Sequence, residues 1–535
     1  MKIMKKISLF IFALISMFAF TFGVSALDVS NEQEFIDALK SGGDIKLTDN
    51  IEVTKEIILD TKVTLDLNGK EVAFAENALI KIIGGNLSIT GTGTLYEKVP
   101  YFSPIIVKGS ENAKDTNYST LTVGANVTLR GWAGIMIDQL SEKEKKRMAY
   151  GVTVNLYGTA IGVEDKTGDP GTGIYVNGNI IHNENAPVIN IYKSAKISAA
   201  SQGIYAAGFA TWNIEDGASV EGTTGIEIRS GILNVNGGTI KGTAIPTETT
   251  PNGNGATTDG AGIAIVQHTT KNTIKVTVTK GLVEGYTAFY QNNTQKNDEA
   301  SVAKIKLAIN GGTFNAINGG KNAVYSENKT NFVTKGTFNA EIDKAYLAEK
   351  TTLEQSDNNY VVKPNVEVES AGVKFESDEP FSNEYTLVVT PKSEDETKAV
   401  TDKLTEAYKD NKKVEGLKLI NLYEINIFDG NDEVVPMEDG KFTISIPLAE
   451  DLRNFKNYKV IYVNEDGEIQ ETIDAKLVNG KVVFTTTHLS TYGVIGYNNP
   501  TMNPETSDGV MTYAVILCAS IFALGSAVTL RKRYN

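Results

Sequence analysis

The sequence predicts an all-β protein that contains a right-handed parallel β-helix, then a β-sandwich, and one transmembrane helix near the C-terminus. Three observations support this prediction. A short strand phrase recurs along the first two thirds of the chain, alternating strands with hairpin turns follow Tyr360, and residues 509–530 carry no charged side chain. Recurring strand phrases, hairpin signals and a long apolar run are typical of these three kinds of structure.

The recurring phrase is Gly-Ile followed by two further strand residues. It begins at Gly134, Gly173, Gly203, Gly225 and Gly262, with weaker copies that begin at Thr287 and Asn322. The interval from Gly203 to Gly225 is 22 residues. Three short strands and three tight turns fill about that length in one β-helix coil, and coils stack about 4.8 Å apart. We therefore place the β-helix over residues 41–362.

Strand alternation predicts which side chains face the inside of each coil. The inward pairs are Ile135/Ile137, Ile174/Val176, Ile226/Ile228 and Ile263/Ile265. A solenoid also needs a cover for its open end. Residues 27–40 are predicted to supply it with a helix from about 31 to 40, because Ser30 and Gln33 have the spacing of a capping box.

The outward positions of the Gly-Ile strand form two columns that contain the candidate ligand-binding residues. The first column is Met136, Tyr175, Tyr205, Glu227, Ala264, Phe289 and Val324, and the second is Asp138, Asn177, Ala207, Arg229, Val266, Gln291 and Ser326. Tyr175 and Tyr205 can stack on a sugar ring, while Asp138, Asn177, Glu227 and Arg229 can bond its hydroxyls. The alternative is that the aromatic side chains only stack on one another.

Polar insertions lie at matching positions of successive coils. Those that follow the Gly-Ile strand are 138–150, 178–187, 267–273 and 291–303, and those that precede it are 162–172 and 243–261. Loops that share a position on successive coils can wall a groove, which would then be the functional face.

A second phrase carries an asparagine column: Asn155, Asn190, Asn213 and Asn234. Side-chain amides at one position of stacked strands bond up and down the stack, so this column is predicted to be a structural ladder. Trp212 lies in register with Leu233 and is predicted to be in the core.

Residues 365–497 predict a β-sandwich of Ig-like class that acts as a stalk. They contain a helical stretch from Glu394 to Tyr408 and alternating strands at 385–389, 421–428, 442–447, 459–463, 482–485 and 492–495. Asp-Gly or Asn-Gly turns begin at Asp429, Asp439, Asp466 and Asn479.

Both ends of the chain indicate export. Lys2, Lys5 and Lys6 precede an apolar segment that stops at small residues, which is typical of a signal peptide over 1–26 with cleavage between Ala26 and Leu27. Residues 498–508 form a linker, 509–530 a transmembrane helix and 531–535 a basic cytoplasmic tail. The bulk of the chain is therefore expected outside the cell.

The C-terminal tail resembles the cell-wall sorting signal of surface proteins from bacteria with thick, Gram-positive-type walls. Those signals read Leu-Pro-any-Thr-Gly before an apolar span and a basic tail. Here the five positions are Asn503, Pro504, Glu505, Thr506 and Ser507. The resemblance implies a sortase that cuts after Thr506 and joins the chain to peptidoglycan, although Asn503 and Ser507 depart from the pattern. An uncleaved single-pass anchor is the alternative.

Charge and composition exclude several functions. Loss of the leader and of residues 507–535 removes six basic residues and one acidic residue, which changes the net charge from −14 to −19. A surface this acidic argues against a nucleic-acid partner. The only cysteine, Cys518, lies in the apolar span, and the three histidines are His182, His268 and His488. A zinc-type site is not expected, and no motif supports Ca²⁺ or another cofactor.

Nearly the whole chain resembles bacterial pectin-lyase-like surface proteins and adhesins. The resemblance rests on the Leu-Asp-Leu-Asn-Gly-Lys phrase at 65–70, the Gly-Gly-Thr-Phe phrase at 311–314 and the closing segments 346–348 and 360–362. It implies a non-catalytic adhesin for glycans or for host or matrix proteins. A wall-attached polysaccharide lyase or hydrolase is the second hypothesis, with Glu227, Arg229, Asp259 and His268 as its best candidates, and a passive stalk is the third.

Overall fold

The computed structural model describes residues 26–498 except 116–117, 139–149, 177–184, 247–258, 383, 410–415 and 438–439. The chain divides into two compact units. The first runs up to residue 348 and includes 353–363, and the second contains 349–352 and the residues from 364 onward. Each unit is described by itself below.

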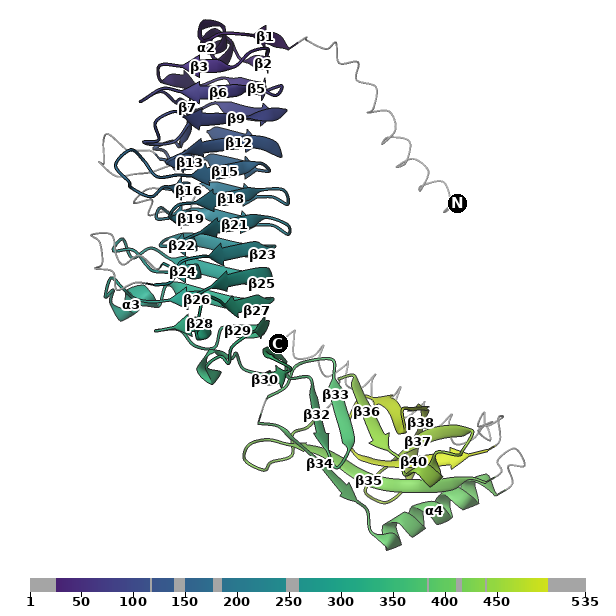
Figure 1. Cartoon of the computed structure of the whole chain (residues 1–535). Coiled ribbons are helices and arrows are strands. Elements are labelled where there is room, and N and C mark those ends of the chain that lie inside the picture. Colours follow the sequence, from purple (N-terminus) through teal and green to yellow (C-terminus); the bar gives the residue numbers. More distant parts are fainter. Residues whose placement is uncertain are drawn as a thin grey trace, which may run out of the picture. The chain divides into compact units, whose positions relative to one another are not determined.

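The first unit is a β-helix-like stack of parallel strands (Figure 1). One side is a ten-stranded sheet of β4 (Ile57–Leu59), β7 (Ile80–Ile83), β10 (Ile105–Lys108), β13 (Ala133–Ile137), β16 (Thr172–Val176), β19 (Gln202–Ala206), β22 (Thr224–Ile228), β24 (Ala261–Ile265), β26 (Thr287–Gln291) and β28 (Asn322–Ser326). The Gly-Ile phrase and its weaker copies lie in the last seven of these strands.

The other strands of the stack form a 21-stranded sheet that is parallel except at its C-terminal end. Its members are β1 (Leu27–Val29), β2 (Gly43–Leu47), β3 (Ile51–Val53), β5 (Lys62–Asp66), β6 (Glu71–Phe74), β8 (Asn86–Thr90), β9 (Thr92–Glu97), β11 (Ser119–Val123), β12 (Asn126–Gly131), β14 (Val152–Leu156), β15 (Thr159–Gly162), β17 (Val188–Ile191), β18 (Lys196–Ala199), β20 (Thr211–Ile214), β21 (Ser219–Gly222), β23 (Gly231–Gly242), β25 (Ile274–Gly285), β27 (Ile305–Ala316), β29 (Val333–Phe338), β30 (Thr351–Ser356) and β31 (Asn359–Pro364). A middle coil thus has three strands, as predicted, and from β23 onward two of the three merge into one.

Coils repeat at the predicted interval where no loop intervenes. Ile204 of β19 pairs with Ile226 of β22, which lies 22 residues later, and both side chains are buried. The glycine before each of these residues has a steric role. A Cβ atom on Gly203 would lie 2.7 Å from the Gly225 carbonyl oxygen. Only glycine lets neighbouring coils approach this closely, which explains why the phrase begins with it.

The N-terminal helix α2 (Glu32–Ser41) covers the end of the stack, but the predicted capping box is wrong by one residue. The cap is Asn31, whose side-chain oxygen accepts the Glu34 amide hydrogen at 3.1 Å. The Glu34 carboxylate reaches back to the Ser30 amide at 2.8 Å. Asparagine is as good a helix cap as serine. The helix begins after Asn31 rather than after Ser30 because Glu34, three residues later, supplies the carboxylate that bonds back to the start of the helix.

The stack changes direction at its C-terminal end. Val333 of β29 bridges to Leu347 in parallel, and β31 then runs antiparallel to β29, with Gly336 opposite Val362. The edge of the last coil is therefore paired rather than open.

The predicted asparagine ladder is present on the 21-stranded sheet. Asn190 donates to Asn155 at 2.9 Å, Asn213 to Asn190 at 2.8 Å, and Asn234 to Asn213 at 2.9 Å. Each bond joins the side-chain amide nitrogen of one coil to the amide oxygen of the coil before it. Trp212 is buried beside the ladder in register with Leu233.

The second unit is antiparallel. Its strands are β32 (Glu367–Ser370), β33 (Val373–Ser377), β34 (Thr386–Pro391), β35 (Lys418–Phe428), β36 (Phe442–Pro447), β37 (Asn457–Val463), β38 (Ile469–Val478), β39 (Lys481–Thr486) and β40 (Thr491–Tyr497), and its helix α4 is Glu394–Tyr408. Short helices α3 (Glu299–Val302) in the first unit and η1 (Lys344–Tyr346) and η2 (Glu450–Leu452) complete the elements.

The Ig-like sandwich is replaced by a near-barrel. The nine strands form one sheet in the order β32-β33-β36-β39-β38-β37-β40-β35-β34, and its edge strands β32 and β34 approach each other. The long strand β38 prevents a split into two sheets. Its first half pairs with β37 and its second half with β39.

Two cores hold this unit together. Phe375, Ile444 and Phe484 are among the side chains that fill the inside of the near-barrel. On the outside, Val400 and Leu404 of α4 pack against β35, β37 and β40. The helix therefore covers one outer face of the sheet.

No helix within the described residues is long and apolar enough to cross a membrane. The predicted signal peptide, except Ala26, and the predicted sorting motif, span and tail lie outside the described residues.

The asparagine ladder predicts a graded effect on stability. Asn213→Ala removes two ladder bonds, and Asn155→Ala, at the end of the ladder, removes one. Because each bond contributes about 1 kcal/mol and orphaned partners cost more, we expect Asn213→Ala to lower the free energy of unfolding by roughly 2 kcal/mol and Asn155→Ala by about half as much. Chemical denaturation measures both. Equal losses of unfolding free energy in the two variants would contradict the ladder, because Asn213 makes two ladder bonds and Asn155 makes one.

Candidate functional site

The candidate site lies on the outer face of the ten-stranded sheet. Met136, Tyr175, Tyr205, Glu227 and Ala264 occupy one register position on β13, β16, β19, β22 and β24. This part of the predicted first column is confirmed.

The last two members of that column are wrong. Phe289 pairs with Ile263 and Val324 with Phe289, so both side chains point into the core and are buried. The outward residues on β26 and β28 are Tyr290 and Tyr325. We aligned Thr287 and Asn322 with the glycine of the phrase, but the next residues, Ala288 and Ala323, occupy the glycine position. The predicted inward and outward positions in these two strands were therefore wrong by one residue. Gln291 and Ser326 of the second column are likewise buried.

Aromatic side chains stack in two groups on this face. The rings of Tyr175 and Tyr205 lie 5.3 Å apart with an interplanar angle of 23°, and Trp132 packs on Tyr175 at 5.6 Å. Tyr290 and Tyr325 form a similar pair at 5.4 Å. Because Tyr175 and Tyr205 use facing ring surfaces to pack on each other, their edges and hydroxyl groups are what a ligand could contact.

Glu227 and Arg229 of the predicted ligand face lie beneath its surface. Each is only 1% exposed. The Arg229 Nη1 atom lies 3.7 Å from Glu227 Oε1 and 3.5 Å from the Tyr205 hydroxyl. Gln202 of the preceding coil donates to Glu227 Oε2 at 3.1 Å and accepts from Ser201 at 2.7 Å. Gln202 was not predicted as a site residue, because it lies at the start of β19, two residues before the inward Ile204, and its bond to Glu227 joins two different coils.

Burial perturbs the acid–base behaviour of this cluster. It raises the pKa of Glu227 to about 7, against the opposing effects of Arg229 and of the Gln202 hydrogen bond, and Asp259 adds to the rise. Burial and then Arg229 lower the pKa of His268. Perturbed groups of this kind collect at functional sites, as well as in structural ion-pair networks.

One edge of the Arg229 guanidinium has no partner among the described residues. Its Nε and Nη2 atoms are buried, and no hydrogen bond to either is found within the described part of the chain. The Nε–Nη2 edge of arginine presents two parallel donors with a geometry that fits carboxylate and other paired oxygen atoms. Leaving two such donors unsatisfied is costly, so this edge is the strongest sign of a ligand on the face.

The remaining predicted face residues are less informative. Asp138 is mostly buried and forms an ion pair with Lys108, with 3.6 Å between Oδ2 and Nζ. Asn177 lies outside the described residues, as do the insertions 139–149 and 247–258 and most of 178–187.

Two of the predicted wall loops contact each other. Gln267 donates to the carbonyl oxygens of Asn272 and Ser301, both at 2.9 Å. Asn297 donates to the Gln267 side chain at 3.0 Å, and Lys271 bonds Asp298 at 2.5 Å. Loops 267–273 and 291–303 therefore form one continuous ridge beside the sheet.

Within the described ranges, no group of three or more His, Cys, Asp or Glu side chains is placed to hold a metal ion. Comparisons of this chain with protein-family models, with curated proteins and with solved structures found no match.

The raised pKa of Glu227 predicts a pH effect on stability. Between about pH 4.5 and 7 the folded chain keeps a proton on Glu227 that the unfolded chain has released, so this group's contribution is present below pH 4.5 and lost as pH rises through 7. Glu227→Gln should remove that loss, which amounts to at most about 3 kcal/mol.

The measurement is the melting temperature of the chain from pH 4 to 8. The exposed Glu221→Gln on β21 is the matched control for the loss of one carboxylate. If Glu227→Gln and the wild type have parallel pH profiles, the proposed protonation of Glu227 is wrong.

Proposed function

We propose that this chain is an exported, wall-attached adhesin with a right-handed, pectin-lyase-like β-helix that binds an extracellular glycan, or a host or matrix ligand, without catalysis. The unpartnered Arg229 edge is the observation that carries this proposal. Ligand oxygen atoms, from hydroxyl or carboxylate groups, would accept the hydrogen bonds that no described protein group accepts.

The surroundings of Arg229 favour a saccharide. The Tyr205 hydroxyl is within 3.5 Å of Arg229, and the Tyr175–Tyr205 stack extends from it along the coils. Aromatic edges with hydroxyl groups, placed beside paired cationic donors, are suited to a ligand that carries both C–H surfaces and many oxygen atoms. The ridge of loops 267–273 and 291–303 lies along the same sheet and would limit how the ligand is oriented.

Export and anchoring belong to the same proposal. Leu27, which follows the proposed cleavage position, is the first residue of β1 and pairs with Ile45. A cut after Ala26 would thus leave the folded part of the chain intact. At the other end, β40 ends at Tyr497, so a sortase that cuts after Thr506 would act beyond the last strand.

A polysaccharide-degrading enzyme is the second candidate, and Glu227 is the observation that favours it. A carboxyl group with a pKa of about 7 is suited to general acid catalysis, and Asp259 contributes to the raised pKa of Glu227. His268 interacts electrostatically with Arg229. Against this, the Glu227 carboxylate already accepts a hydrogen bond from Gln202 and pairs with Arg229. A passive stalk is the third candidate.

The binding proposal is tested by retention on a panel of immobilised polysaccharides, with and without Ca²⁺, while polymer length is followed. Arg229→Lys keeps the charge and removes the paired donors, so retention should fall about tenfold or more. Tyr192→Phe, in the stacked Tyr157–Tyr192 pair of the other sheet, is the control.

The other outcomes of this experiment separate the three candidate functions. Equal retention of Arg229→Lys and wild type would contradict the assignment of Arg229. Shortened polymer that depends on Glu227, tested with Glu227→Gln, would make the chain an enzyme. Failure of the wild type to bind any polysaccharide, matrix protein or host protein would favour the stalk.

The anchoring proposal predicts a change of cell fraction. Thr506→Ala removes the threonine side chain that the motif requires next to the cut, so the chain should move from the peptidoglycan-linked fraction to the membrane fraction at higher mass. Glu505→Ala, at the variable position, should leave wall attachment unchanged. Fractionation with a muramidase and mass spectrometry measure both. Wild-type chain that still carries residues 509–530 would show an uncleaved anchor instead.

A further inference from the structure

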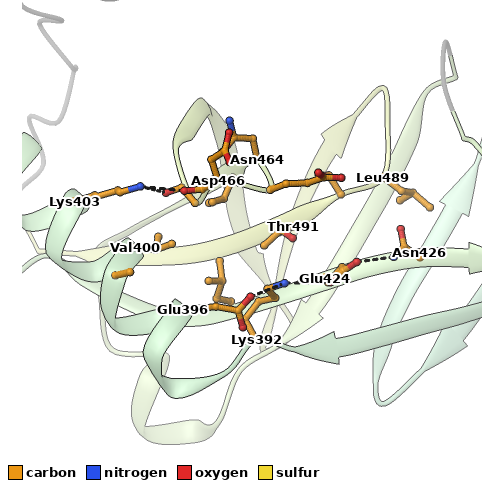
Figure 2. A pocket seen from close by; sticks show the side chains of 16 residues that line it. Lys392, Glu396, Val400, Lys403, Glu424, Asn426, Asn464, Asp466, Leu489 and Thr491 are labelled. Atoms are coloured by element: carbon orange, nitrogen blue, oxygen red, sulfur yellow. Dashed lines mark hydrogen bonds and ion pairs between the residues drawn. The ribbon is translucent and has the colours of Figure 1, made fainter.

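The second unit contains a cavity of about 440 Å³ between α4 and the outside of the near-barrel (Figure 2). Four segments line it. They are the start of α4 with the preceding Lys392, the middle of β35, the turn between β37 and β38, and residues 489–491 at the start of β40. Small-ligand sites occupy about 300–1,000 Å³, so this cavity has room for a ligand the size of one ring.

The walls of the cavity are held in place by bonds within the protein. Lys392 bridges Glu396 at 2.9 Å and Glu424 at 3.2 Å, which ties α4 to β35. Lys403 bonds Glu468 at 2.7 Å and the Gly467 carbonyl oxygen at 3.0 Å, which ties α4 to the β37–β38 turn. Figure 2 shows Lys403 beside Asp466 of this turn. These contacts leave both lysines engaged before any ligand arrives.

The fourth wall is fixed by a tyrosine. The Tyr492 hydroxyl donates to the His488 carbonyl oxygen at 2.6 Å and bonds Thr486 at 2.9 Å. This arrangement resembles the tyrosine corner of β-sandwich proteins, in which a hydroxyl holds the turn just before it. It holds the turn that carries Leu489, Ser490 and Thr491 against the cavity.

The chemistry of the lining is that of a site for a polar ring that carries no negative charge. Val400, Leu422, Val463 and Leu489 supply apolar surface. Within the described part of the chain, four lining groups make no hydrogen bond: the Asn426 side-chain oxygen, the Asn464 side-chain nitrogen, and the Ser490 and Thr491 hydroxyls. An apolar surface combined with a few donors and acceptors matches a ring with hydroxyl groups.

The charge of the lining adds a preference. It contains four carboxylates, of Glu396, Glu424, Glu465 and Asp466, and two ammonium groups, of Lys392 and Lys403. Both ammonium groups are already bonded to carboxylates. An anionic ligand would meet an excess of negative charge, whereas a neutral or amine-bearing ligand would not.

We propose that this cavity binds a single sugar ring of a glycan, and that it prefers an amino sugar or a neutral hexose to a uronic acid. The second unit would then be a ligand-binding module in its own right. This proposal does not depend on the β-helix face around Arg229, because none of the residues of that face belongs to the second unit.

Saturation-transfer NMR on residues 27–498 tests whether the cavity binds a sugar ring. The affinities of glucosamine, glucose and glucuronate are measured. Glucosamine and glucose should bind, and glucuronate should bind at least several-fold more weakly. Thr491→Val removes one hydroxyl at constant volume and should weaken both bound sugars about fivefold. Thr443→Val on β36, which does not line the cavity, is the control.

A second variant tests the charge preference without disturbing the core. Glu465 is exposed, and Glu465→Gln should weaken glucosamine about twofold while glucose is unchanged. Lysine methyl ester serves as an amine without a sugar ring. The proposal would be overturned if neither hexose bound, or if lysine methyl ester bound in their place. It would also be overturned if Thr491→Val and the wild type had equal affinities for the sugars. Thr491 belongs to the second unit and Arg229 to the first, so a loss caused by Thr491→Val is distinguished from a loss at the β-helix face.

Discussion

The close approach of neighbouring coils is the constraint on which the first unit depends. At Gly173, Gly203, Gly225 and Gly262 an added Cβ atom would come within 2.5–2.7 Å of a carbonyl oxygen on the next coil. In these middle coils the absence of a side chain at this column allows the close approach, whereas the small side chains of Ala288 and Ala323 occupy the same column in the last coils. Strand pairing then fixes every other column. The asparagine ladder, the isoleucine layers and the tyrosine stack are all consequences of the same register.

That register also explains the unusual cluster on the outer face. Gln202, Glu227 and Arg229 come from two successive coils and are brought together because β19 and β22 pair in parallel. A buried arginine whose Nε and Nη2 atoms have no partner among the described residues costs stability. By contrast, Asn213 uses both its donor and its acceptor within the ladder. The asparagine column, whose hydrogen bonds are made within the stack, therefore has a structural role. Arg229, whose Nε and Nη2 atoms have no partner among the described residues, is instead a candidate for ligand binding.

Much of this could be predicted from the sequence, because strand alternation and the 22-residue interval leave few alternatives for the middle coils. The helix from Glu394 to Tyr408 was also predicted at its observed bounds. The errors have local causes. Ala288 in place of glycine shifted the alternation of β26 by one residue. The strand β38 was missed because charged residues separate its apolar ones, although Ile473, Ala475 and Leu477 pack on the core. The burial of Glu227 and the free edge of Arg229 depend on contacts between coils, which no single strand reveals.

The central claim is that the Arg229 edge meets a ligand. The most direct measurement is a crystal structure of residues 27–498 with the saccharide that is retained best on the polysaccharide panel. The account predicts ligand oxygen atoms within hydrogen-bonding distance of both Arg229 Nε and Nη2, next to the Tyr205 hydroxyl. A ligand bound elsewhere on the β-helix, with both Arg229 nitrogens paired to protein atoms, would contradict it.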